Sequence, residues 1–219
     1  MPANILIINP NSTASMTAEI GEAARSFALS DTTIVAVNPA DGPPSIQGAE
    51  DGQACLPGLF ATFDEAVGCA SYDAVIIACF DDTGLEKLKA RSDVPVLGIG
   101  EAAFHAALIL GNTFSTVTTL SVSIPVIEAN IDRYGFAERS MCVRASEVPV
   151  LEIGSHTEDA IRKEVQCAIE EDNCDSVVLG CAGMATLASA MSADFGVPVI
   201  DGVSAAVGFC ETLNRLRGV

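Results

Sequence analysis

Two cysteines, Cys79 and Cys181, stand at matching points of an internal repeat. Each ends a short apolar run, which reads YDAVIIAC in the first half and CDSVVLGC in the second. Both copies continue into a similar Val-Pro segment, at 94–97 and 197–200. The offset is 102 residues at the cysteines (181 − 79) and 103 at the prolines (198 − 95). Chance placement of a cysteine at the same point of both copies is improbable, so we interpret the pair as functional.

Two thiols that face a substrate from opposite sides are suited to removing a proton from a carbon and returning one to its other face. One acts as the thiolate base and the other as the thiol acid, and the roles exchange with the direction of reaction. A free cysteine has a pKa of about 8.5, which a helix N-terminus or nearby donors lower. Because each cysteine precedes a predicted helix, we expect the helix dipole to favour the thiolates. The backbone N–H groups of Phe80, Asp81, Ala182 and Gly183 are candidates for stabilising an enolate oxygen.

The elements that must position these thiols alternate along the chain, which is typical of an α/β fold with parallel sheets. We expect strands at 4–8, 32–37, 74–78, 95–99, 115–120, 141–144, 176–179 and 197–200. We expect helices at 13–29, 53–69, 83–90, 101–110, 122–134, 157–171, 184–195 and 203–216. The repeat predicts two similar docked lobes related by a pseudo-twofold axis, each with a parallel four-stranded sheet. Residues 1–97 with 203–219 are expected to form the first lobe, and 98–202 the second.

Ligands of open α/β sheets bind beyond the carboxyl ends of the strands, and both cysteines lie where a predicted strand ends. We therefore expect the active site in the cleft between the lobes. Candidate substrate-binding residues near this cleft are Asn9 and Asn11 after the first strand, Thr118 and Thr119 at the equivalent place of the second half, and Ser45 in a loop over the cleft. Each has the alternative interpretation of an ordinary turn or helix-capping residue.

Composition limits the classes of partner. The 219-residue chain has 29 acidic and 11 basic residues, and its net charge of −18 repels nucleic acid and anionic membranes. Residues 1–4 lack a basic region and the apolar run 5–8 is too short for a signal peptide, so we expect a cytoplasmic protein. With two histidines, no C-x-x-C motif and no Gly-rich phosphate loop, we expect neither a metal nor a cofactor. The expected partner is a small-molecule substrate.

The sequence resembles the aspartate/glutamate racemase superfamily, and within it the hydantoin and allantoin racemase branch. Segments that carry the resemblance cover nearly the whole chain, at 8–13, 78–85, 100–105, 114–120, 178–184 and 197–206. The resemblance implies a two-lobed α/β fold, a homo-oligomer, no cofactor, and acid/base roles for Cys79 and Cys181. It implies racemisation of a substrate whose C–H proton is acidified by a neighbouring carbonyl.

The residues after the cysteines bear on the substrate. Amino-acid racemases of the superfamily have Asn-Thr and Thr-His there, where this chain has Phe80-Asp81 and Ala182-Gly183. Loss of these polar groups, which would hold an α-carboxylate, favours an uncharged cyclic substrate such as a 5-substituted hydantoin, allantoin included. The branch usually reads Phe-Gly-Asp-Pro-Gly after its first cysteine, whereas this chain reads FDDTG at 80–84. Because of this extra carboxylate, the sequence does not specify which substituted hydantoin is the substrate.

Two pairs of residues, Asp81 with Asp82 and Glu101 with His105, have more than one interpretation. A carboxylate touching Cys79 would raise its pKa, so we expect Asp81 and Asp82 to cap a helix, point away from the thiol or bind substrate N–H groups. Glu101 and His105 are four residues apart on a helix, and we expect a first-turn acid and a packed or exposed histidine rather than a proton relay.

The functional alternatives are an aspartate/glutamate-type racemase, a one-cysteine malonate decarboxylase and a non-catalytic two-lobed binding protein.

Overall fold

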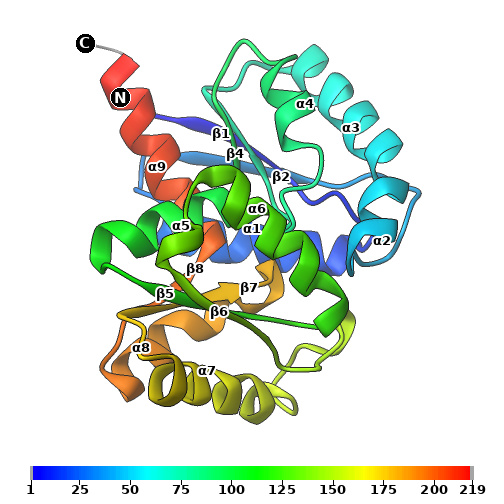
Figure 1. Ribbon diagram of the computed structural model, residues 1–219. Helices are drawn as coiled ribbons and strands as arrows, with labels where there is room; N and C mark the ends of the chain where they lie inside the picture. Colours follow the sequence, from blue (N-terminus) through cyan, green and yellow to red (C-terminus); the bar gives the residue numbers. More distant parts are fainter. Residues whose placement is uncertain (1, 218–219) are drawn as a thin grey trace.

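The protein contains two parallel four-stranded sheets with the same strand order, seen in a computed structural model that describes residues 2–217 (Figure 1). The order is β2-β1-β3-β4 in the first sheet and β6-β5-β7-β8 in the second. The strands are β1 (Asn4–Ile8), β2 (Thr33–Val37), β3 (Ala74–Ile77), β4 (Val96–Gly98), β5 (Phe114–Thr118), β6 (Ser140–Ala145), β7 (Ser176–Gly180) and β8 (Val199–Asp201). The predicted α/β class and the duplication of a four-stranded parallel sheet are confirmed.

Helices alternate with the strands. They are α1 (Ala14–Phe27), α2 (Ala49–Ala54), α3 (Leu56–Cys69), α4 (Leu85–Lys89), α5 (Ile99–Leu110), α6 (Ile124–Tyr134), α7 (Glu158–Asp172), α8 (Ala188–Phe195) and α9 (Gly202–Arg217). Short 3₁₀ turns are η1 (Ser121–Ser123), η2 (Ala137–Arg139), η3 (Val150–Glu152) and η4 (Ala182–Leu187). Across residues 2–217, no helix has the length and apolar character needed to cross a membrane.

Two predicted helices differ most from the observed ones, and the others agree to within two residues at each end. The helix expected at 53–69 begins at Leu56, with Pro57 in its first turn, where proline is well tolerated. It is preceded by the separate α2, which contains Gly52 among its six residues and so carries a weak helical signal. The helix expected at 184–195 starts as the 3₁₀ turn η4 directly after Cys181.

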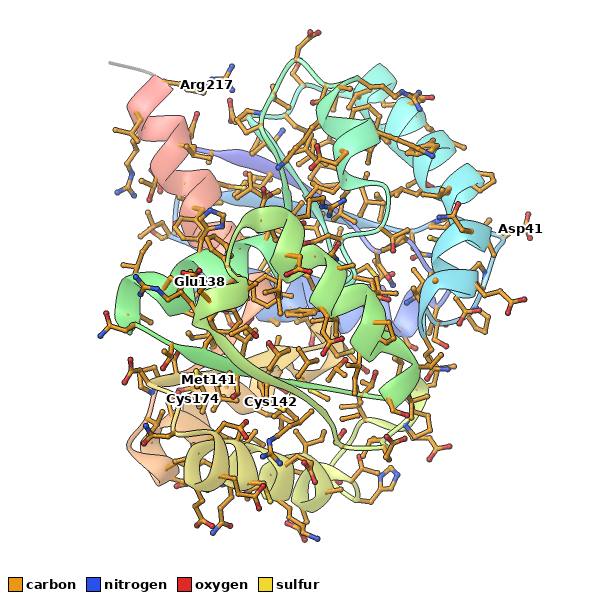
Figure 2. All side chains as sticks on the ribbon, viewed as in Figure 1. Asp41, Glu138, Met141, Cys142, Cys174 and Arg217 are labelled. Atoms are coloured by element: carbon orange, nitrogen blue, oxygen red, sulfur yellow. The ribbon has the colours of Figure 1, made fainter. Side chains whose placement is uncertain are left out.

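Helices cover both faces of each sheet, which explains why the strands are apolar on both sides. Helices α3 and α4 pack on the outer side of the first sheet, and α7 and α8 on the outer side of the second (Figure 1). Helices α5 and α9 contact both sheets, and α1 packs against α9. Side chains fill the space between these layers (Figure 2). One apolar core joins the halves, since it contains Ile5 and Ile7 of β1 together with Val117 of β5 and Val177 of β7.

The lobe boundaries given above stay a prediction, because α9 contacts β3 and β4 of the first sheet and also β7 and β8 of the second. Residues 1, 218 and 219, which the prediction assigns to the first lobe, are not among the residues that the structure describes.

Hydrogen bonds between loops of the first half and helices or turns of the second hold the lobes together. The Asn130 side-chain amide donates to the Asp81 carbonyl oxygen at 2.8 Å, and the Tyr134 hydroxyl donates to the Asp82 carboxylate at 2.7 Å. The Val150 backbone N–H donates to the side-chain oxygen of Gln47 at 3.1 Å. All three bonds lie close to the carboxyl ends of the strands, so they also close the region between the lobes.

Candidate active site

Cys79 and Cys181 lie on equivalent turns at the ends of β3 and β7. The carbonyl oxygen of Cys79 accepts the Asp82 N–H at 3.0 Å, and that of Cys181 accepts the Met184 N–H at 3.1 Å. In both turns the N–H of the second residue after the cysteine interacts with the sulfur and works to lower the thiol pKa. The duplication has therefore kept the backbone around both thiols alike.

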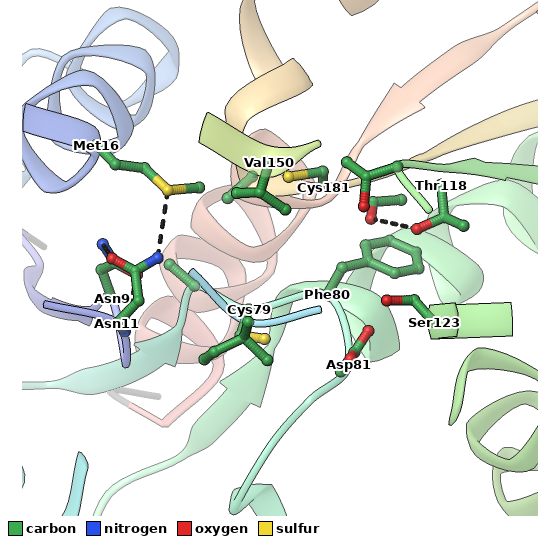
Figure 3. A pocket seen from close by; sticks show the side chains of 15 residues that line it. Asn9, Asn11, Met16, Cys79, Phe80, Asp81, Thr118, Ser123, Val150 and Cys181 are labelled. Carbon is green, nitrogen blue, oxygen red and sulfur yellow. Dashed lines mark hydrogen bonds between the residues drawn. The ribbon is translucent and has the colours of Figure 1, made fainter. Parts of the chain in front are cut away.

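Both thiols line one cavity of about 30 Å³ between the lobes (Figure 3). In that view Cys79 lies at the lower side of the cavity and Cys181 at the upper side. This volume is far below the roughly 300–1,000 Å³ of typical ligand pockets. Any organic substrate requires lining segments to move apart.

Most of the residues proposed from the sequence as substrate contacts line this cavity. These are Asn9, Asn11, Phe80, Asp81, Thr118, Thr119 and Ala182. Ser45 is buried beside the cavity, and its neighbour Ile46 lines it instead. Gly183 lies outside the lining, next to Ile153 and Cys181. Residues that the sequence did not point to are Met16, Ile46, Ala78, Ser123, Val150 and Gly180.

Asn9 and Asn11 differ in how much hydrogen-bonding capacity they have left. The Asn9 amide donates to the Asn11 side-chain oxygen at 2.9 Å and to the Thr17 hydroxyl at 3.0 Å. The Asn11 amide nitrogen donates to the Met16 sulfur at 3.3 Å, and a thioether is a weak acceptor. Asn11 is therefore the asparagine with a donor to offer a ligand carbonyl, while Asn9 holds Asn11 in place.

Thr118 is the counterpart of Asn9. The strand register pairs Ile8 with Ile77 and Val117 with Leu179, so the next residues, Asn9 and Thr118, are equivalent. The Thr118 hydroxyl donates to the Gly180 carbonyl oxygen at 3.2 Å across the strand ends.

Asp82 is turned away from the cavity and caps α5. Its carboxylate accepts the N–H groups of Gly100 at 3.0 Å and Glu101 at 2.7 Å, in addition to the Tyr134 hydroxyl. A left-handed φ of 49° at Asp82 aims the side chain in this direction. Gly100 permits the close approach, since a Cβ there would lie 2.4 Å from the Phe80 carbonyl oxygen. Asp82 thus locks the Cys79 turn against the start of α5.

Asp81, by contrast, lines the cavity with a side chain that is 8% exposed. Its oxygen Oδ2 is buried and has no hydrogen-bond partner among the described residues. Burial raises its pKa from 3.8 to about 7, against the opposing effect of the Gly48 backbone N–H. Asp81 is thus a buried carboxylate on the cavity lining, and the described lining contains no Lys, Arg or His to compensate its charge.

The thiol pKa values contradict the expectation that helix dipoles lower them. Burial raises the pKa of Cys181 from 9.0 to about 12 and, followed by the Asp81 charge, raises that of Cys79 well above its ordinary value. Helix α4 begins only at Leu85, too far from Cys79 for its dipole to act on the sulfur. Burial therefore favours the neutral form of both thiols in the described conformation.

Glu101 and His105 follow the expectation of a surface pair rather than a relay. The Glu101 carboxylate bonds to the Lys89 ammonium at 2.6 Å, and the His105 ring nitrogen Nδ1 lies 2.8 Å from the Glu101 carbonyl oxygen. Neither residue lines the cavity that holds the two thiols.

Asp81→Asn is expected to raise the free energy of unfolding at pH 8 by on the order of 2 kcal/mol. The folded-state pKa of Asp81 is about 7 against an ordinary 3.8, so the penalty for burying its charge is complete above pH 7 and shrinks as the pH falls toward 4. Urea unfolding at pH 8 and pH 5 checks this, with the exposed Asp41→Asn as the control. A stabilisation that grows as the pH falls would show that the Asp81 carboxylate is not strained by burial.

Known proteins resemble the chain over almost its full length. The model of the Asp/Glu/hydantoin racemase family matches residues 5–210. A hydantoin racemase from Rhizobium meliloti is 43% identical over 215 residues, covering 96% of this chain and 88% of that protein. An allantoin racemase from Klebsiella pneumoniae superposes with a TM-score of 0.94 at 39% identity, over 98% of this chain and 89% of that one. An allantoin racemase from Pseudomonas fluorescens gives a TM-score of 0.90 at 38% identity, over 98% and 92% of the two chains.

Proposed function

The chain belongs to the Asp/Glu/hydantoin racemase family, and from this membership we propose that it racemises 5-substituted hydantoins, allantoin included, without a cofactor. The proposed mechanism is proton transfer between Cys79, the C5 carbon and Cys181. The observation that carries the proposal is that two equivalent turns, one from each half, each bring a thiol to the same cavity.

The chemistry of the ring suits two thiols. The C5–H bond of a hydantoin lies between a carbonyl and a nitrogen, so the carbanion delocalises into an enolate. One cysteine, as thiolate, takes the proton and becomes a thiol, and the other, as thiol, protonates the opposite face and becomes a thiolate. Reaction in the other direction begins from the protonation state that the first turnover leaves.

Donors at the strand ends are available for the enolate oxygen and the ring carbonyls. Phe80 and Ala182, the residues that follow the two cysteines, both line the cavity and offer backbone N–H groups at equivalent positions. The Asn11 amide is available for the carbonyl on the far side of the ring, with Asn9 positioning it. We assign contacts to the polar side chains of Thr118 and Thr119 on the second half.

A thiolate must form at the start of each turnover, although burial opposes it. Cys181 is expected to ionise more readily than Cys79. At Cys79 the charge of Asp81, which raises the pKa, outweighs the Asp81 backbone N–H, which lowers it, whereas at Cys181 the Gly183 backbone N–H outweighs the Asp81 charge. We therefore propose that Cys181 is the thiol that ionises first, when the substrate enters. The opening that admits the substrate also admits water, which lowers the cost of ionising the thiol.

The charges around the cavity disfavour the two alternative enzyme activities. Aspartate, glutamate and malonates carry carboxylates, which are held by cationic or hydrogen-bond-donating side chains. In the described structure, the residues that line the cavity include no Lys, Arg or His and do include Asp81. The carboxylates of these substrates would therefore be repelled by a buried carboxylate, whereas an uncharged hydantoin would not.

The proposal predicts that purified protein abolishes the circular dichroism of single enantiomers of allantoin and of 5-alkylhydantoins, after correction for spontaneous racemisation. L-aspartate and L-glutamate should keep their optical activity under the same conditions. Dialysis against a chelator should leave the rate unchanged. Racemisation of aspartate with no activity on any hydantoin, or loss of activity on chelation with recovery on adding a metal, would contradict the proposal.

A further inference from the structure

The second half of the protein shows that the Asp81 side chain is not needed to build its turn. The repeat offset of 102 residues places Gly183 at the position equivalent to Asp81 (183 − 81). The Gly183 turn has the same backbone hydrogen bond, from the third residue after the cysteine to the cysteine carbonyl, without any side chain at that position. The Asp81 backbone is further fixed by the Asn130 amide, which binds its carbonyl oxygen and not its carboxylate.

The carboxylate nevertheless occupies a costly position. Asp81 is 8% exposed, and its Oδ2 atom has no partner in the part of the chain that the structure describes. Buried carboxylates in folded proteins are normally paired or fully hydrogen-bonded. A side chain that the turn does not need, and that lines the cavity with one oxygen lacking a hydrogen-bond partner, is suited to a partner that arrives with the ligand. Such a partner must donate a hydrogen bond.

The layout of the cavity indicates which part of the ligand reaches Asp81. In Figure 3, Asn11 lies on one side of the two thiols, and Asp81 with Ser123 lies on the other. If C5 sits between the thiols and Asn11 binds the carbonyl on the far side of the ring, the C5 substituent points toward Asp81 and Ser123. The carboxylate thus faces the substituent, which is the part that differs among hydantoins.

From this arrangement we infer that Asp81 is a specificity-determining residue that accepts a hydrogen bond from an N–H group of the C5 substituent. The site then selects ureido-substituted hydantoins, of which allantoin is the simplest, over alkyl-substituted ones. This inference rests on the proposed hydantoin racemisation. A ureido N–H supplies the missing partner of Oδ2, whereas an alkyl group of the same shape leaves the buried carboxylate unpaired. Discrimination of this kind is large, because the penalty for the wrong substrate is an unsatisfied buried charge.

Three substrates of matched size test the inference. They are allantoin, 5-(carbamoylmethyl)hydantoin, in which the first substituent N–H is replaced by CH₂, and 5-isobutylhydantoin, in which all substituent N–H groups are replaced. kcat/KM for each substrate is measured with the wild type and with Asp81→Asn. The ratio of variant to wild type is then compared among substrates, so that differences in intrinsic C5 acidity cancel.

Asp81→Asn is expected to reduce the preference for allantoin over 5-isobutylhydantoin by roughly 10- to 100-fold. The exposed Asp41→Asn, which removes the same charge from a surface loop, should leave the preference unchanged. Asp81→Gly copies the residue of the equivalent turn and provides a second variant if the amide disturbs folding. It should reduce the preference by a similar factor.

The outcomes separate this inference from the proposed function. Equal losses on all three substrates, or an unchanged preference in both Asp81 variants, would overturn the role of Asp81 while leaving racemisation intact. A wild type that racemises none of the three substrates would instead overturn the proposed function. An intermediate effect on 5-(carbamoylmethyl)hydantoin would support a bond from the terminal amide as well as from the first N–H.

Discussion

Alanine at Cys79 is expected to lower kcat/KM for racemisation of a hydantoin by about 10³-fold or more, and alanine at Cys181 is expected to do the same. The two thiols line the cavity from different halves of the protein, and Asp81 is the one other acidic residue on the described lining. A proton removed from one face cannot be returned to the other when the second thiol is missing. Steady-state circular dichroism of enantiopure substrate measures the effect.

Buried cysteines outside the cavity provide the controls. Cys55 is buried close to Cys79, and its thiol donates to the Gly52 carbonyl oxygen at 3.3 Å. Cys174 precedes β7 at the opposite end of the strand from Cys181 and is labelled in Figure 2. Cys55→Ala and Cys174→Ala should keep kcat/KM within about threefold of the wild type once folding is verified. Racemisation within tenfold of the wild type in Cys79→Ala or Cys181→Ala would remove that thiol from the mechanism.

The sequence repeat predicted the fold well because both of its copies contain a buried strand followed by a cysteine. Strands β3 and β7 and their neighbours are short and apolar, and parallel pairing leaves few arrangements for them. The internal register then places Asn9 and Thr118 beside the thiols. These residues were identifiable because polar side chains directly after apolar strands are a recognisable signal.

Apolar lining residues carried no such signal. Ile46 and Val150 lie in loops of different halves, and they meet over the cavity through the hydrogen bond between Gln47 and Val150. Met16 is one of several buried residues on α1, and its helical spacing is that of an ordinary core position. Contacts of this kind depend on how the lobes dock, which no local pattern specifies.

Asp81 and Asp82 illustrate a second limit. They are identical neighbours in the sequence, yet one faces the cavity and the other caps α5. The left-handed φ at Asp82 turns its side chain toward α5. Because aspartate tolerates this conformation, either residue was a candidate to adopt it. Sequence reasoning therefore left both open.

The thiol pKa values were mispredicted because two effects of different size compete. A helix dipole contributes about 0.3–1 kcal/mol near an exposed terminus. Burial raises the pKa of Cys181 from 9.0 to about 12, and each unit corresponds to about 1.4 kcal/mol. Burial therefore dominates, and its extent was not apparent from the sequence.

The two cysteine variants are further expected to exchange the C5 proton with solvent in opposite enantiomers. Cys79→Ala keeps the base on the Cys181 side, and Cys181→Ala keeps the base on the Cys79 side. A single thiolate is able to remove a proton and return a solvent deuteron on its own face without inverting the carbon. Exchange without racemisation is thus the expected property of each variant, at a rate below that of wild-type turnover because the missing partner also disturbs substrate position.

Proton NMR measures this exchange most directly. Each pure enantiomer of 5-isobutylhydantoin is incubated in deuterated buffer with each variant, and an enzyme-free sample gives the spontaneous rate. Cys79→Ala should label one enantiomer and Cys181→Ala the other, each with retention of configuration. Labelling of the same enantiomer by both variants, or racemisation by either at the wild-type rate, would contradict a mechanism with one thiol on each face of the substrate.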